Sequence, residues 1–175
     1  IEIEPLSKNT INFLTWFSNY NLVPLGMCLK LHLINDENLR IKNDKDLLRY
    51  SLTNEKESYQ LSEEQDKAYK ELSKNDSSFR VHLLQGTTGS GKTLVYFKAI
   101  EKILNIGSQA LILLPEIGLT NEFEKKFKSY FGFEAAVWHS KVSPKKRKII
   151  WNGLSTGKIK VVTVSYTHLT LPTKA

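Results

Sequence analysis

Hydrophobic residues recur every three or four positions near the start of the chain, a pattern that predicts helices. Ser7 can cap a first helix over residues 8–20, and residues 24–30 can form a second with a proline in its first turn. The spacing of Trp16 and Tyr20 in the first helix favours a place in the helix core over base stacking. The N-terminal part is therefore expected to be a small helical unit.

From residue 61 onward the pattern alternates between helices and short apolar runs. Ser62 followed by Gln65 matches a capping box at the start of a helix. The run at residues 110–114 is apolar throughout, which is typical of a strand buried on both faces. The expected helices cover residues 62–73, 93–104, 120–131 and 144–154, and the expected strands cover residues 81–84, 110–114, 135–138 and 160–164. Such alternation predicts an α/β fold with a parallel sheet.

Composition and charge narrow the class of protein. Hydrophobic residues make up 41% and charged residues 25% of the 175 residues, which is typical of a globular protein and excludes wholesale disorder. The net charge of +7 is uneven, with −2 over residues 1–80 and +9 over residues 81–175. A basic half indicates a polyanionic partner such as nucleic acid or nucleotide, and a lysine-rich solvated surface is the alternative.

The location of the protein is also constrained by its sequence. The single cysteine, Cys28, excludes an internal disulfide and favours a reducing compartment. No apolar run has the length of a membrane span, and the chain does not open on a signal-peptide pattern. We therefore expect a cytoplasmic protein without a membrane partner.

The strongest motif is a phosphate loop at residues 86–93, which fits G-x-x-x-x-G-K followed by Ser or Thr. Its glycines let backbone N–H groups approach phosphate oxygens, and the positive end of the following helix faces the same anion. Lys92 is expected to reach the β- and γ-phosphates of ATP, and the Thr93 hydroxyl to bind Mg²⁺, so these two are the predicted catalytic residues. The alternative is a glycine turn with an incidental lysine. The predicted cofactor-binding residues of the loop are Gly86, Thr87, Thr88, Gly89, Ser90, Gly91, Lys92 and Thr93.

Three further segments are similar to motifs of superfamily 2 helicases. Residues 61–65, Leu-Ser-Glu-Glu-Gln, precede the phosphate loop at the spacing of the adenine-reading glutamine of that superfamily. Residues 114–120, Leu-Pro-Glu-Ile-Gly-Leu-Thr, resemble a motif that contacts single-stranded DNA. Residues 138–140, Trp-His-Ser, resemble a His-Ser step of the same proteins. With the phosphate loop, these segments resemble the first part of the helicase domain of the PriA (primosomal protein N′) family of bacterial replication-restart helicases.

The resemblance implies a fold, a function and partners. The fold is an incomplete RecA-like parallel sheet of the phosphate-loop NTPases, and the function is ATP-dependent 3′-5′ DNA unwinding that starts primosome assembly at stalled forks. The implied partners are single-stranded and forked DNA, other primosome proteins and single-strand-binding protein. Gln65 is then expected to read adenine, while its alternative role is that of the capping-box partner of Ser62. The implied DNA-binding residues are Pro115, Glu116, Gly118, Thr120, His139 and Ser140.

Two of these assignments have alternatives in the residues themselves. His139 stands at the end of an expected strand, where a lone histidine has a structural role as often as a ligand-binding one. The lysines and arginine between residues 141 and 148 are either a solvated face or a source of salt-dependent contacts to a nucleic-acid backbone.

The resemblance also divides the chain into parts. Trp16, Tyr20 and residues 24–26 resemble the end of the family's 3′-DNA-binding domain. The tail resembles translated sequencing-adapter read-through, with a native strand and turn as the alternative. The expected parts are a DNA-binding remnant at residues 1–34, a linker at 35–60 with a short helix near residues 47–50, the start of the helicase domain at 61–163, and the tail at 164–175.

Several parts that a helicase of this family needs are missing from the sequence. No aspartate follows Asp76, and the glutamates after the phosphate loop do not stand in an Asp-Glu-x-His setting. The family's acidic box, zinc-binding cysteines and second RecA-like domain would lie beyond residue 175. The fragment alone is therefore expected to bind nucleotide without turnover, and zinc is expected only in the full-length protein. A small-molecule phosphotransferase and a non-catalytic nucleotide- or DNA-binding module stay open as other functions.

Overall fold

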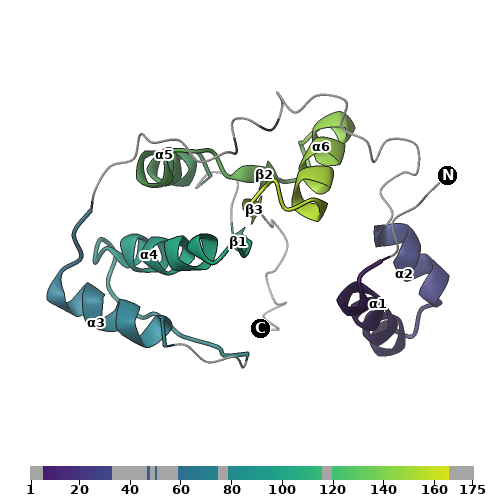
Figure 1. Ribbon diagram of the computed structural model, residues 1–175, viewed down its shortest axis with the longest axis horizontal. Coiled ribbons are helices and arrows are strands. Elements are labelled where there is room, and N and C mark those ends of the chain that lie inside the picture. The colour runs from purple at the N-terminus through teal and green to yellow at the C-terminus, as the bar shows by residue number, and fades with distance from the viewer. Residues whose placement is uncertain are drawn as a thin grey trace, which may run out of the picture. The chain divides into compact units, whose positions relative to one another are not determined.

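The computed structural model describes residues 6–32, 47, 50, 59–74, 79–115 and 120–165. The chain divides into two compact units, Ile1–Arg40 and Ile41–Ala175. The described part of the first unit is helical, and that of the second is a parallel sheet with helices on both faces (Figure 1).

The first unit contains the helices α1 (Lys8–Asn21) and α2 (Leu25–His32). The Ser7 hydroxyl accepts a hydrogen bond from the Thr10 backbone N–H at 3.1 Å, which confirms the predicted cap of α1. Leu22 ends the helix in the left-handed conformation with φ 54°. The first helix and the second therefore begin and end within a few residues of the predicted positions.

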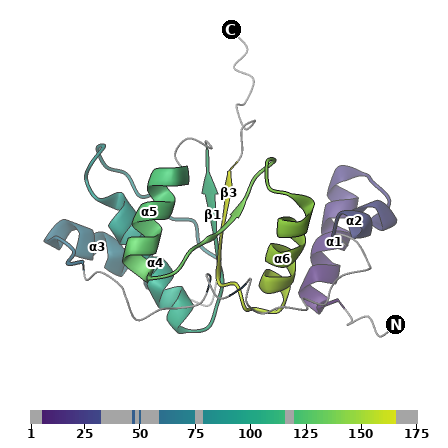
Figure 2. The same cartoon turned by 90° about the horizontal axis from the view of Figure 1, so that it is seen from above.

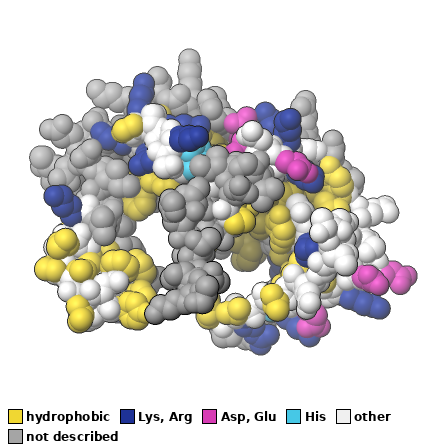
Figure 3. Space-filling view, turned by 180° about the vertical axis from the view of Figure 1, so that it is seen from behind, with side chains coloured by type: hydrophobic (Ala, Val, Ile, Leu, Met, Phe, Trp, Pro, Cys, Tyr) yellow, Lys and Arg dark blue, Asp and Glu magenta, His cyan; other side chains and the backbone are white. Residues whose placement is uncertain are grey.

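The aromatic side chains of α1 do not lie in a core. Trp16 is 55% exposed and Tyr20 is 74% exposed, and their rings stack on each other with centroids 5.3 Å apart. Figure 3 shows hydrophobic side chains gathered on the surface of this unit. The prediction that the two rings belong to the helix core is therefore wrong for the described unit, because two short helices share one inner face and these rings lie outside it.

The second unit is built around a three-stranded parallel sheet in the order β1-β3-β2. The helices α4 and α5 lie on one face of the sheet and α6 on the other, while α3 lies beside α4 (Figure 2). The elements are α3 (Glu63–Leu72), α4 (Lys92–Asn105), β1 (Ala110–Leu114), α5 (Thr120–Phe131), β2 (Ala136–Trp138), α6 (Pro144–Ser155) and β3 (Val161–Ser165). This arrangement confirms the predicted α/β class with an incomplete RecA-like sheet.

Local signals set the helix ends of this unit. The Ser143 hydroxyl accepts from the Lys146 N–H and Pro144 is the first residue of α6, as predicted. Gly132 follows α5 with φ +76°, a conformation that glycine adopts without strain. These signals act over a few residues, which is why the sequence alone predicts the helix boundaries closely.

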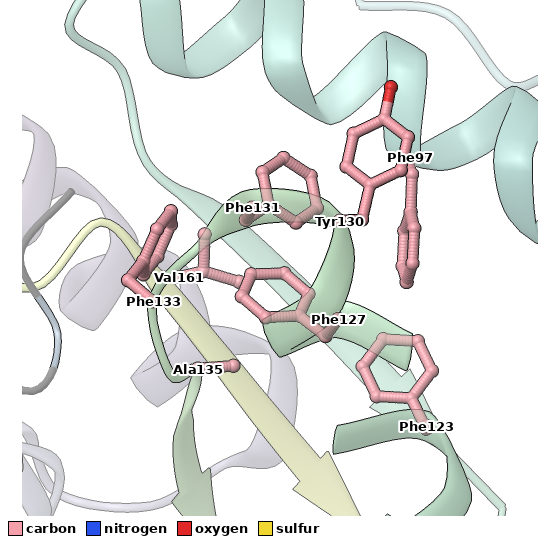
Figure 4. Packing of buried hydrophobic residues seen from close by; sticks show 8 residues of the cluster. All are labelled: Phe97, Phe123, Phe127, Tyr130, Phe131, Phe133, Ala135 and Val161. Carbon is pink, nitrogen blue, oxygen red and sulfur yellow. The ribbon is translucent and has the colours of Figure 1, made fainter. Parts of the chain in front are cut away.

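Aromatic residues fill the core between the sheet and the α4–α5 face. The Phe127 side chain is fully buried, and its ring lies 5.7 Å from that of Phe97 on α4 and 4.4 Å from that of Phe131 (Figure 4). Spacings of three and four residues bring the aromatic residues of α5 onto one face of the helix. The buried members of the cluster are Phe97, Phe123, Phe127, Tyr130, Phe131, Phe133, Ala135 and Val161.

A second cluster packs α6 against the opposite face. Ile150 and Ile159 are fully buried there, next to Ala136 and Val162 of the sheet. Leu47 and Tyr50 are also buried in this cluster, although they come from the segment expected to be a linker.

The predicted strand at residues 81–84 is not formed. Residues 79–87 have no regular secondary structure, and Leu83 is 90% exposed. A strand needs a hydrogen-bonding neighbour, and no described strand lies on the side of β1 opposite β3. The prediction of a strand at residues 81–84 is therefore wrong for the described residues, although the apolar pattern alone favours one.

The prediction that β1 is buried on both faces is also wrong. Its residues alternate, so that Ile112 packs into the aromatic cluster while Leu111 and Leu113 are exposed. The α6 helix covers the opposite face at β2 and β3, and the cluster it forms does not include Leu111 or Leu113.

Candidate nucleotide-binding site

The phosphate loop leads directly into α4. Gly89 and Gly91 have φ values of +82° and +77°, which other residues adopt only with strain. Gly91 is the N-cap of α4 and offers no side chain to the first turn of the helix. The N–H groups at this end therefore suit an anion as their partner, because a helix N-terminus carries a partial positive charge.

The Lys92 ammonium lies over the loop. Its Nζ donates to the carbonyl oxygens of Gly86 at 2.8 Å and Thr87 at 2.7 Å, and lies 3.4 Å from the Ser90 hydroxyl. These acceptors are neutral, so the charged oxygens of a phosphate would make stronger hydrogen bonds with the same ammonium. The residues present therefore fit a phosphate group.

Thr93 is the second residue of α4 and is half-buried beside Lys92. Its hydroxyl is an oxygen ligand of the kind that Mg²⁺ prefers, and one such ligand suffices when nucleotide phosphates and water supply the others. The loop thus fits MgATP, with Lys92 for the phosphates and Thr93 for the metal ion. Bound ATP would supply the phosphoanhydride bond whose cleavage drives work.

Gln65 connects the start of α3 to the phosphate loop. Its Oε1 accepts from the Ser62 backbone N–H at 3.0 Å, and Ser62 Oγ accepts from the Gln65 N–H at 3.3 Å, which confirms the predicted capping box. Its Nε2 donates to the Ser90 carbonyl at 3.0 Å. A Cβ at Gly91 would overlap Gln65 Nε2, so the amide is packed directly against the loop.

The phosphate loop forms one wall of a cavity of about 390 Å³. This volume lies within the range of small-molecule sites. The lining residues are Tyr59, Gly89, Gly91, Lys92, Thr93, Leu94, Phe97, Lys126 and Tyr130. Sequence reasoning missed Tyr59 and Lys126, because neither belongs to a motif and Tyr59 lies in the expected linker.

Tyr130 forms the buried end of this cavity. Burial raises the pKa of Tyr130 to about 12, and the neighbouring Glu101 carboxylate contributes in the same direction. The phenol therefore stays neutral over the whole physiological range and acts as an apolar wall with one hydrogen-bonding end.

Three of the predicted DNA-binding residues lie in two segments at one edge of the sheet. Pro115 follows β1, and His139 and Ser140 follow β2. Since β1 and β2 both pair in parallel with β3, with Leu114 opposite Ser165 and Trp138 opposite Val164, the two segments lie at the same carboxyl edge. They are two strand spacings apart, about 10 Å. Such an edge is where α/β sheets bind ligands.

The remaining predicted DNA-binding residues are less completely described. Thr120 begins α5, and only its backbone is described. Glu116 and Gly118 lie outside the described residues.

His139 and Ser140 form a turn that the α6 helix holds in place. His139 Nδ1 accepts from the Lys141 backbone N–H at 3.1 Å. Arg147 Nη2 donates to the carbonyl oxygens of His139 at 3.2 Å and Ser140 at 2.8 Å, and the guanidinium lies 5.7 Å from the Trp138 ring centroid. The His139 ring is therefore held in a turn beside the basic N-terminus of α6.

Two features are absent from the residues that the structure describes. No helix in them is both long and apolar enough to span a membrane. They also contain no group of three or more His, Cys, Asp or Glu side chains arranged to hold a metal ion.

Comparisons with known proteins agree with the motifs. Residues 62–174 match the DEAD/DEAH box helicase family. The replication restart protein PriA of Rickettsia felis is 36% identical over 172 residues, which cover 97% of this chain and 25% of that protein. The PriA of Haemophilus influenzae is 44% identical over 86 residues, which cover 49% of this chain and 12% of that protein. The PriA of Helicobacter pylori is 40% identical over 114 residues, which cover 65% of this chain and 18% of that protein.

The chain corresponds to a part of these longer relatives. The chain spans about a quarter of the length of the first of these relatives, and nearly all of the chain takes part in the match. The helicase family covers well over half of the chain and includes the phosphate loop and both candidate DNA segments. The chain therefore belongs to the DEAD/DEAH box helicase family, and nearly all of it is similar to a part of the replication restart protein PriA.

Proposed function

We propose that this chain is the nucleotide-binding segment of an ATP-dependent DNA helicase that starts replication restart at stalled forks. The observation that carries the proposal is the phosphate loop, with two glycines at positive φ and the Lys92 ammonium held over it. The match to proteins named replication restart protein PriA supports the biological setting.

Each residue of the site has a proposed role. Lys92 neutralises the β- and γ-phosphates, Thr93 binds Mg²⁺, and the backbone of residues 86–91 surrounds the phosphates. Gln65 reads the adenine edge. Its amide has already used one N–H on Ser90 and one oxygen lone pair on Ser62, which leaves one donor and one acceptor for a base.

The proposed DNA path runs along the carboxyl edge of the sheet. Pro115, Glu116, Gly118 and Thr120 would form one contact segment, and His139 with Ser140 the other. Exposed lysines at the start of α6, such as Lys145 and Lys146, support backbone contacts at this edge. The substrate would be single-stranded and forked DNA, with movement in the 3′-5′ direction.

The wider setting of the proposal follows from the same resemblance. Other primosome proteins and single-strand-binding protein would be its partners. The cytoplasm would be its location, and zinc would be bound by other parts of the full-length protein.

ATP turnover is proposed to need residues outside this chain. Hydrolysis requires a carboxylate that holds Mg²⁺ through water and positions the attacking water. No aspartate follows the phosphate loop in the sequence, and described glutamates such as Glu101 and Glu122 are paired with lysines. The 175-residue chain alone should therefore bind MgATP without hydrolysing it.

The nucleotide assignment is tested by replacing Lys92. Lys92→Ala should raise the dissociation constant of MgATP by about 10- to 100-fold, because the loop loses its only side-chain cation and its charged hydrogen bonds to the phosphates. Lys98→Ala is the matched control, since Lys98 lies on the same helix but pairs with Glu101. Titration calorimetry measures the dissociation constant of MgATP for the parent and the two variants. A Lys92→Ala protein that binds MgATP as tightly as the parent would show that the nucleotide assignment is wrong.

The helicase assignment is tested in the full-length protein. Single-stranded DNA should stimulate ATP hydrolysis, and a duplex with a 3′ single-stranded tail should be unwound faster than one with a 5′ tail. A rate of ATP hydrolysis that single-stranded DNA does not change would contradict the proposed activity. Faster unwinding of the duplex with the 5′ tail would contradict the proposed direction.

A further inference from the structure

The Arg147 side chain holds the turn that carries two of the candidate DNA-binding residues. Its Nη2 donates to the His139 carbonyl oxygen at 3.2 Å and to the Ser140 carbonyl oxygen at 2.8 Å. The guanidinium also lies 5.7 Å from the centroid of the Trp138 ring, at the end of β2. One side chain from the start of α6 therefore fixes the backbone of three consecutive residues at the carboxyl edge of the sheet.

These contacts determine which way the polar groups of the turn point. A carbonyl oxygen carries partial negative charge and would repel a phosphate, but both oxygens are directed at the guanidinium. The described residues contain no cis peptide bond, and in a trans peptide the C=O and the N–H point in opposite directions. The Ser140 N–H therefore points away from Arg147, as a donor suited to an anion.

The same turn orients the His139 ring. Its Nδ1 accepts from the Lys141 N–H at 3.1 Å, so the neutral ring carries its proton on Nε2. The ring is half-buried, and its Nε2–H is a second donor from this turn. With Arg147 in place, the turn has its acceptors on the inside and donors left for a phosphate oxygen.

The guanidinium pays a cost at this position. Arg147 Nε is buried and has no hydrogen-bond partner among the residues that the structure describes. A buried unpaired N–H is unfavourable, so an apolar side chain would serve better if α6 only had to pack against the sheet. The two carbonyl contacts of Nη2 are what an apolar residue could not supply.

We propose that Arg147 is a positioning residue that orients the turn of His139 and Ser140 for contact with the backbone of single-stranded DNA. The proposal deepens the proposed function and rests on it, because the turn must first bind DNA. Arg147 acts through the turn and does not itself touch a phosphate.

The test measures the affinity of the full-length protein for single-stranded oligothymidylate over a series of salt concentrations. The variants are Arg147→Ala, Arg147→Lys and, as the matched control, Arg80→Ala. Arg80 is an exposed arginine outside both candidate DNA segments, so its replacement removes the same charge without affecting the turn. The MgATP dissociation constant of each variant is measured by calorimetry, as a check on the fold.

Arg147→Ala should weaken DNA binding by about 10-fold, the effect of one lost hydrogen bond to a charged group, and leave the MgATP dissociation constant within about twofold. Arg147→Lys can still donate to the carbonyl oxygens and should stay within about threefold of the parent. The salt dependence should not change, because the lost contacts come from the uncharged donors of the turn. Arg80→Ala should bind DNA like the parent.

A double-mutant cycle separates positioning from direct contact. In a protein that already carries His139→Ala and Ser140→Ala, Arg147→Ala should cost little further DNA affinity. Full additivity, or a slope of log affinity against log salt that falls by about 0.7, would show that Arg147 binds a phosphate itself and would overturn the positioning role.

Two other results would also overturn it. One is unchanged DNA affinity in Arg147→Ala while the His139→Ala, Ser140→Ala protein binds DNA weakly. The other is an equal loss of DNA and MgATP affinity in Arg147→Ala, which would indicate general damage to the fold. If the His139→Ala, Ser140→Ala protein binds DNA as tightly as the parent, the proposed DNA path fails and the positioning role fails with it, so the two failures are distinguishable.

Discussion

Replacing Gly91 by alanine tests whether the phosphate loop and Gln65 work as one unit. The residue has φ +77°, and a Cβ there would overlap Gln65 Nε2. Alanine in the left-handed conformation costs about 1–2 kcal/mol. The overlap also displaces the amide, which would lose its bonds to Ser90 and Ser62, each 3.0 Å long. Each bond contributes about 0.5–1.5 kcal/mol, so the displaced amide adds about 1–3 kcal/mol.

A second glycine separates the two costs. Gly107 has φ +81°, but a Cβ there meets no atom within 4 Å. Gly107→Ala should therefore show the backbone cost alone and lower the free energy of unfolding by about 1–2 kcal/mol without changing nucleotide binding. Gly91→Ala should lower the free energy of unfolding further. It should also raise the dissociation constant of MgATP by about 10- to 100-fold, because the lost amide contacts destabilise the loop conformation that binds the nucleotide.

A double-mutant cycle identifies the overlap as the cause. In a Gln65→Ala background there is no amide to displace, so Gly91→Ala should cost less MgATP affinity than it does in the parent. Titration calorimetry on the four proteins gives the coupling. Strict additivity of the two substitutions, or an equal loss of affinity in Gly107→Ala, would refute the reasoning.

Two further predictions concern stability. Gly153→Ala should lower the free energy of unfolding by about 1–3 kcal/mol through overpacking, because the new Cβ would lie 2.6 Å from Ile159 and 3.2 Å from Leu47. Gly26→Ala has open space around its Cβ and should raise the free energy of unfolding by up to about 1 kcal/mol. Urea melts in which Gly153→Ala is more stable than Gly26→Ala would contradict this prediction. Because the pKa of Tyr130 is raised to about 12 from the ordinary value near 10, the unfolded state loses its proton first, so stability should fall as the pH rises from about 10 to 12. Tyr130→Phe should remove this part of the slope, and an unchanged slope in that variant would show that other groups cause it.

Much of the fold could be predicted because its signals are local. The Ser62 and Gln65 capping box, the Ser143 cap and the spacing of phenylalanines in α5 each act within one or two turns of helix. The phosphate loop is of the same kind, because eight consecutive residues contain both the glycines and the lysine. The sequence alone therefore predicts the helices and the phosphate loop at the centre of the candidate site.

The incorrect and missing predictions concern contacts between distant residues. The apolar pattern of residues 81–84 predicts a strand, but pairing depends on a neighbour that the pattern cannot supply. Leu47 and Tyr50 lie in a polar stretch and still enter the core, about 100 residues before their α6 partners in the sequence. Tyr59 is likewise brought to the site by its contacts with Ser129 and Tyr130, some 70 residues away.

Gln65 shows how a structural role and the proposed binding role can belong to one side chain. The sequence presents helix capping and base reading as alternatives, yet a primary amide has two N–H donors and an oxygen with two lone pairs. In the structure the cap uses one lone pair and the phosphate loop one N–H. The amide is therefore held by α3 and by the loop at once, with one donor and one acceptor still available. A base that binds them would meet a group already oriented, so it would lose less entropy on binding than with a free side chain. Capping thus prepares the proposed reading of adenine and does not compete with it.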